Sequence, residues 1–84
     1  MKLTRKNIRS LQEILRANYN SDIKVIKQLD NWGIIKISLK DIKEPIGTRK
    51  MSSILEDFGF KLLPIWSLFS DELWLNFEEI KEYE

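Results

Sequence analysis

The chain has 84 residues, of which 43% are apolar, 32% are charged and 11% are aromatic, and it contains neither Cys nor His. This length accommodates a single domain, which we expect to span residues 1–84. The two absences exclude disulfides, thiolate nucleophiles, the usual zinc ligands and imidazole acid–base chemistry. We therefore expect a protein that is not an enzyme and that uses no cofactor and no metal.

The start of the chain carries charges every few residues, so it lacks the uninterrupted apolar stretch of a signal peptide. No segment approaches the ~20 apolar residues of a membrane span. A chain without cysteine also suits a reducing compartment. We expect a cytoplasmic protein that does not act at a membrane.

The net charge of +1 conceals an asymmetry. Residues 1–50 hold 12 Lys or Arg and five acids, whereas residues 51–84 hold two Lys and eight acids. The first half of the chain is therefore basic and the second half is acidic. Either this asymmetry faces a charged partner or the two halves neutralise each other within the fold.

The first half predicts one helix and two strands. A helix from about Thr4 to Asn18 places its apolar residues on one face, with Thr4 as its N-cap. Alternating or β-branched residues then predict strands over Asp22–Leu29 and Trp32–Lys40, joined by a turn at residues 30–31. This pair of strands is a hairpin.

The second half of the chain predicts the same order, one helix followed by two strands. Pro45 and Gly47 end the preceding strand, and a helix follows from about Thr48 to Phe58 with its apolar residues at i, i+3, i+4 and i+7. Gly59 supplies the left-handed residue of a C-cap. A second hairpin then runs over residues 61–69 and 72–80, with a turn at residues 70–71.

The resulting order, αββαββ, predicts an α+β protein with two layers: a four-stranded antiparallel sheet with two helices on one face. This order is that of a ferredoxin-like plait whose first strand has moved to the end. It places the strands in the order 3-4-2-1; the alternative is a separate three-stranded or swapped arrangement. Pro64 suits an edge strand because proline cannot donate to a ladder, and Lys24 and Lys27 would protect the other edge from pairing.

The sheet face away from the helices is more apolar than a bare surface. If Leu73, Leu75 and Phe77 face the helices, alternation places Trp74 on the open face. Trp32 is either a lid on the core or an exposed anchor. The residues that we expect at a protein interface are Trp74, Ile65, Phe69, Leu63, Ile34 and Trp32. They predict an adaptor or inhibitor that docks onto a protein partner or a second copy of itself. A register slip of one residue, or a folded-back C-terminal segment, would bury this face instead.

The alternative is a nucleic-acid-binding protein that uses the basic face of the first helix, the sheet lysines and the start of the second helix. Its candidate residues are Lys2, Arg5, Lys6, Arg9, Arg16, Lys24, Lys36, Lys40, Arg49 and Lys50. The strand over residues 72–80 offers Trp74 to the open face but the strand over Trp32–Lys40 is expected to offer no aromatic there, so a base-stacking platform is incomplete. The competing interpretation is a solvated helix face, or one neutralised by the C-terminal acids Glu78, Glu79, Glu82 and Glu84.

Overall fold

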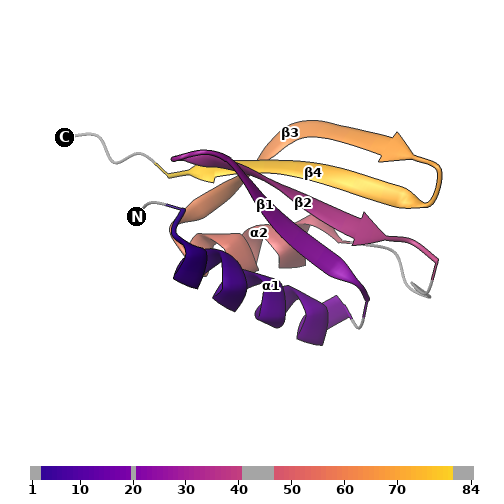
Figure 1. The fold of residues 1–84 in the computed structure, drawn as a ribbon, viewed down its shortest axis with the longest axis horizontal. Helices are drawn as coiled ribbons and strands as arrows, with labels where there is room; N and C mark the ends of the chain where they lie inside the picture. Colours follow the sequence, from indigo (N-terminus) through magenta and orange to yellow (C-terminus); the bar gives the residue numbers. More distant parts are fainter. Residues whose placement is uncertain (1–2, 20, 41–46, 81–84) are drawn as a thin grey trace.

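The computed structural model describes residues 3–19, 21–40 and 47–80. Its elements follow the predicted order, and their ends lie within two residues of the predicted ones (Figure 1). They are α1 (Arg5–Tyr19), β1 (Ile23–Leu29), β2 (Trp32–Ser38), α2 (Thr48–Asp57), β3 (Phe60–Phe69) and β4 (Glu72–Glu79).

The four strands form one antiparallel sheet in the order β1-β2-β4-β3. Both helices lie against the same face of this sheet, and the other face is open (Figure 1). The central strands are therefore β2 and β4, and the edges are β1 and β3, as the strand order predicted from the sequence requires. Pro64 lies on the β3 edge, and Lys24 and Lys27 lie on the β1 edge.

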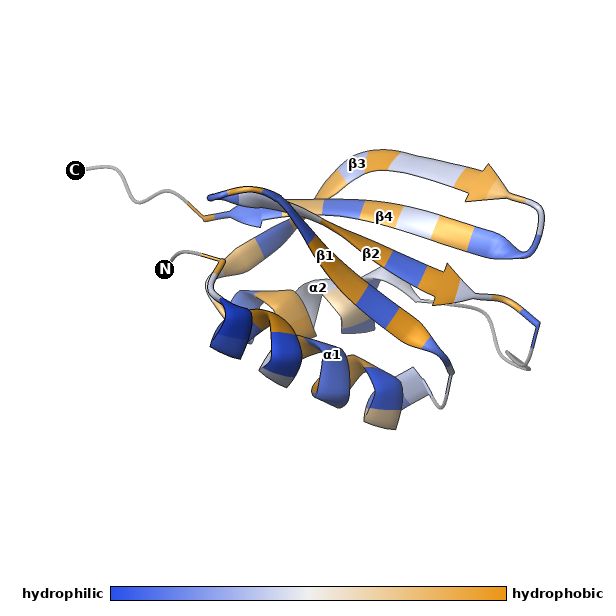
Figure 2. Ribbon diagram, in the orientation of Figure 1, coloured by the Kyte–Doolittle hydropathy of each residue, from blue (hydrophilic) through white to orange (hydrophobic). Residues whose placement is uncertain are grey.

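The core lies between the sheet and the helices. Alternate residues of β1 and β2 point into it, and Figure 2 shows the matching alternation of hydrophobic and hydrophilic residues along these strands. Phe60 and Phe77 meet edge to face with ring centroids 5.3 Å apart, and both side chains are fully buried. The buried apolar residues are Leu3, Leu11, Leu15, Ile23, Val25, Ile35, Ile37, Met51, Leu55, Phe60, Leu75 and Phe77.

Local signals at the ends of the elements explain where these begin and end. The Thr4 hydroxyl oxygen accepts a hydrogen bond from the Asn7 amide at 3.1 Å, which caps α1 as predicted. Gly59 follows α2 with φ of 82°, the left-handed conformation that glycine adopts without strain. Ser70 is the first central residue of the β3–β4 turn and has φ of 50°. Among the helices that the structure describes, none is long and apolar enough to cross a membrane.

Candidate interaction surface

The outer half of β3 carries a group of exposed apolar side chains. Ile65 is 61% exposed, Trp66 62%, Leu68 57% and Phe69 51%, and only Ser67 interrupts them. We call these four residues the β3 apolar segment. Figure 2 shows orange and pale colours, without strong blue, along this part of the strand. An apolar group of this density on a surface typically marks an interface.

The β3 apolar segment is exposed on both faces of the sheet. Ser67 pairs with Trp74, and Phe69 pairs with Glu72, so Phe69 lies on the open face. Leu68 pairs with Leu73 on the opposite face, which is the face that the helices cover elsewhere in the sheet. The high exposure of Leu68 shows that the helix layer does not extend beneath this end of the hairpin.

A bulge separates the two halves of β3. The register shifts between Leu62 and Trp66, so the three residues 63–65 stand opposite Asn76 alone. The Asn76 side-chain nitrogen Nδ2 donates a hydrogen bond to the Ile65 carbonyl oxygen at 3.1 Å. This bond replaces part of the backbone hydrogen bonding that the bulge interrupts. The Asn76 side-chain oxygen in turn accepts a hydrogen bond from the Trp32 indole nitrogen at 3.1 Å. One polar side chain of β4 thus holds both the bulge and Trp32.

Trp74 lies beside the β3 apolar segment on the open face and is half-buried. Its ring centroid is 4.7 Å from that of Phe69, and the Lys36 ammonium nitrogen stands 4.1 Å from the ring centroid. Its indole nitrogen donates to the Glu72 carboxylate at 2.6 Å. These contacts fix the orientation of the ring, so it can support Phe69 as a rigid part of the same surface.

The structure brings together some of the predicted interface residues and separates others. Phe69 and Trp74 are in ring contact near the outer end of β3 and β4, and Ile65 lies on β3 in the bulge opposite Asn76. Leu63 lies in the bulge, and Ile34 and Trp32 lie further along the open face; all three are half-buried.

Trp32 is the first residue of the central strand β2 and pairs with Glu78 on the open face. The expectation that β2 offers no aromatic to this face is therefore wrong. The alternation that places Ile34 and Lys36 on the open face also places Trp32 there, since the predicted strand already begins at this residue.

Trp66 and Leu68 belong to the exposed surface but were not predicted. Alternation assigns them to the helix-facing side of β3, and there they lie. A strand pattern gives the face of a residue but not whether a helix covers that face. The signal in the sequence was the density of large apolar residues from Ile65 to Phe69, which alternation alone does not account for.

The predicted basic residues do not form one continuous surface. Arg5, Lys6 and Arg9 are exposed on α1, and no ion pair joins them to any residue that the structure describes. Lys24 and Lys36 lie opposite each other on the open sheet face, away from α1. Lys2, Glu82 and Glu84 lie outside the described residues, as does Pro45.

Other predicted cations and acids have partners of their own. The Arg16 Nε donates to the Ile23 carbonyl oxygen at 2.8 Å, so Arg16 does not join the outward basic face that the helical periodicity predicted. The Lys50 ammonium donates to the Asn18 carbonyl oxygen at 3.3 Å. Glu78 pairs with Lys61 at 3.3 Å rather than with α1. Arg49 and Lys40 are exposed.

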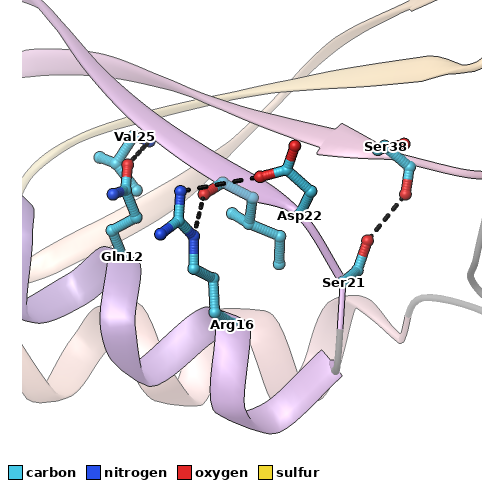
Figure 3. Close-up of polar contacts among 7 residues, drawn as sticks. Gln12, Arg16, Ser21, Asp22, Val25 and Ser38 are labelled. Atoms are coloured by element: carbon cyan, nitrogen blue, oxygen red, sulfur yellow. Dashed lines mark hydrogen bonds and ion pairs between the residues drawn. The ribbon is translucent and has the colours of Figure 1, made fainter.

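The edge formed by β1 is closed by side chains of α1 (Figure 3). The Arg16 Nε donates a hydrogen bond to the Ile23 carbonyl oxygen, and the Arg16 guanidinium also lies 3.7 Å from the Asp22 carboxylate. The Gln12 side-chain oxygen accepts a hydrogen bond from the Val25 amide at 2.9 Å. The Ile23 carbonyl and the Val25 amide, two of the outward backbone groups of β1, therefore already have partners within the chain.

The described residues include no group of three or more Asp or Glu that could hold a metal ion. Burial raises the pKa of Tyr19, whose hydroxyl donates to the Gly47 carbonyl oxygen at 3.5 Å, so this tyrosine stays protonated at neutral pH. Its position between the helices serves packing.

The chain matches no protein-family profile, no curated protein and no solved structure. Any function must therefore be argued from the surface itself.

Proposed function

We propose that the protein is a small, non-catalytic interaction protein, an adaptor or inhibitor, that binds another protein surface through the β3 apolar segment. The observation that carries the proposal is the exposure of Ile65, Trp66, Leu68 and Phe69, each more than half exposed, along one edge strand. Large aromatic and aliphatic side chains are the usual anchors of protein interfaces. The absence of Cys and His supports the non-catalytic part of the proposal, and the absence of Cys supports a cytoplasmic location.

The hydrophobic effect favours burial of the β3 apolar segment in a complex. Burying one large apolar side chain contributes roughly 1.5–3 kcal/mol relative to leaving it exposed. Covering four side chains that are each more than half exposed offsets a large part of the cost of association, which is about 4–15 kcal/mol. Rigid support from Trp74 lowers the ordering cost at Phe69 because the two rings are already in contact.

Photo-crosslinking in the cells that make the protein tests this proposal. A photoreactive phenylalanine analogue in place of Phe69 should give discrete protein adducts. The matched control places the analogue at Ile14, which is 40% exposed and isolated on α1. Adducts at position 69 that disappear with Leu68→Lys support the proposal. No adducts at position 69, or equal adducts at both positions, would contradict it.

A second candidate function, binding of single-stranded nucleic acid, is favoured by one observation on the open face. Trp32 and Trp74 stand on the two central strands, and Lys24 and Lys36 continue across the sheet in the same row as Trp74. Aromatics on central strands flanked by cations are the arrangement that stacks bases and contacts phosphates. Lys36 already occupies one face of Trp74, which weakens this candidate relative to the first.

Tryptophan fluorescence tests the second candidate. Titration with a mixed-sequence single-stranded oligonucleotide at low and high salt should quench the fluorescence at low salt only, because counterion release drives such binding. Lys24→Glu should weaken the binding, whereas Lys27→Glu, at the bulge on the same strand, should leave it nearly unchanged. Fluorescence that does not respond to the oligonucleotide would eliminate this candidate.

We also propose that the fold is a ferredoxin-like plait with its first strand moved to the end. The strand order and the two helices on one face support this assignment. The Leu3 amide donates to the Asp30 carbonyl at 3.1 Å and the Glu79 amide to the Asn31 carbonyl at 2.8 Å, so both ends of the described chain meet at one turn. A circular permutant that begins with β4 should therefore fold cooperatively with an unchanged far-UV spectrum. An unfolded permutant would argue against the assignment.

A further inference from the structure

The two edges of the sheet differ in how well they are protected. On β1, side chains of α1 form hydrogen bonds with the outward Ile23 carbonyl and the outward Val25 amide. A bulge follows between Lys27 and Leu29. On β3, Pro64 and the bulge of residues 63–65 interrupt the middle of the strand. Residues 66–69 contain no charge, no proline and no bulge. An edge strand without these features is a template for the addition of another strand.

The backbone of this part of β3 has groups that point outward. Phe69 and Glu72 flank the two-residue turn and form the first pair of the hairpin, which is a hydrogen-bonded pair in such turns. Because bonded and non-bonded pairs alternate along an antiparallel ladder, Trp66 and Leu68 direct their N–H and C=O groups away from β4. These two residues also have the exposed side chains on the helix side of the sheet.

The order of side chains along the segment is symmetric about Ser67. Two apolar residues precede this serine and two follow it. A twofold axis at Ser67, normal to the sheet, would place Trp66 opposite Leu68 of a second copy and Ile65 opposite Phe69 of the second copy. Each of the four residues would then be covered by another of the same four.

We propose that β3 pairs antiparallel with β3 of a second copy of the chain about this axis, so that two four-stranded sheets form one continuous sheet of eight strands. This inference rests on the proposed function, because it names the partner of the same surface.

The distribution of charge favours the antiparallel arrangement over the parallel one. The turn after β3 is acidic, with Asp71 and Glu72, whereas Lys61 near the start of β3 is the strand's only charged residue. In the antiparallel pair each acidic turn lies toward the Lys61 end of the other strand, where Lys61 also has Glu78 at 3.3 Å, so the two acidic turns are kept apart from each other. A parallel pair would place the two acidic turns side by side, where like charges repel.

Disulfide trapping tests the pairing and its register, because the chain has no other cysteine. In Ser67→Cys the two thiols would face each other across the axis, with Cα atoms roughly 4.5–5.5 Å apart, a separation that a disulfide bridges. Mild oxidation with glutathione disulfide should link this variant into dimers at least about tenfold faster than the control Ser53→Cys, which has its thiol exposed on α2. Equal rates for the two variants would overturn the pairing.

Light scattering of the unmodified chain provides the second measurement. The expected result is a mass of two chains, with a dissociation constant that Leu68→Lys raises at least about tenfold, because a lysine at a sheet edge opposes pairing. The control Ile14→Lys, on α1, should leave it unchanged. A mass of one chain at the highest soluble concentration would overturn the pairing, and so would a dimer that Leu68→Lys does not weaken.

These outcomes separate the inference from the proposed function. If the chain is monomeric but the analogue at Phe69 crosslinks to a different protein, the interaction surface is retained and self-pairing is wrong. If the chain is monomeric and Phe69 gives no adduct, both are wrong. If the adduct at Phe69 is with a second copy of the chain, both are supported.

Discussion

Replacing Gly33 by alanine should destabilise the protein strongly, because the added methyl group has no free space in the core. A Cβ atom at this position would lie 2.7 Å and 2.8 Å from two ring carbons of Phe77 and 2.9 Å from the Ile26 carbonyl oxygen. Ordinary contacts between such atoms are about 3.5–4.0 Å, so the neighbours must move by more than half an ångström. Phe77 is fully buried against Phe60, and the Ile26 oxygen belongs to the backbone, so neither neighbour moves easily.

Overpacking of a filled core costs about 1–3 kcal/mol, and the rigid neighbours of Gly33 place this variant near about 3 kcal/mol. At about 4–8 °C per kcal/mol for a domain of this size, the melting temperature should fall by roughly 12–24 °C. Urea unfolding followed by circular dichroism measures the change, with Gly47→Ala as the control, since no atom lies within 4 Å of its added Cβ. If Gly33→Ala unfolds at the same urea concentration as Gly47→Ala, the packing of Phe77 over this glycine is incorrect.

Three further predictions concern stability. Leu55→Ala removes a fully buried side chain from α2 and should cost roughly 2–5 kcal/mol in urea unfolding; an unchanged midpoint would mean that α2 does not pack on the sheet. Ser70→Gly relieves the positive φ of 50° and should stabilise the protein by about 1 kcal/mol, so a lower melting temperature would contradict the turn conformation. Gln12→Ala leaves the Val25 amide without its partner, so it should lower the free energy of unfolding by about 1 kcal/mol and speed hydrogen exchange at that amide. The control Glu13→Ala should do neither, and equal exchange in the two variants would argue against the closed β1 edge.

The periodicity of apolar residues and the turn residues were enough to predict every element. Thr4 and Gly59 act within a few residues of themselves, so their effects can be read from neighbouring positions. The strand order followed from the element order αββαββ, interpreted as a permuted plait, and Pro64 and the lysines of β1 agreed with it because each residue type is compatible with an edge. The signals for the elements themselves are local, and the structure agrees with them.

The candidate surface was predictable only in part. Alternation correctly placed Phe69 beside Trp74 on the open face, but the exposure of Trp66 depends on where the helix layer ends, which is a property of the assembled fold. Arg16 has the angular position of a solvated residue, yet its long side chain reaches the Ile23 carbonyl on the neighbouring strand. Asn76 acquires its role from a bulge on the opposite strand, which no pattern within β4 indicates.

The strand order also bears on how the chain folds as it is synthesised. The contacts that close the β1 edge join residues 13 and 7 positions apart, so they form at low entropic cost as soon as β1 has emerged. The strand made after all the other described strands, β4, belongs in the middle of the sheet, where it separates β2 from β3. Until it arrives, β2 has one unpaired side and β3 has no partner at all. The most vulnerable intermediate is therefore a nearly complete chain rather than a short one, and a ribosome that stalls within β4 would leave two unpaired strands exposed at once.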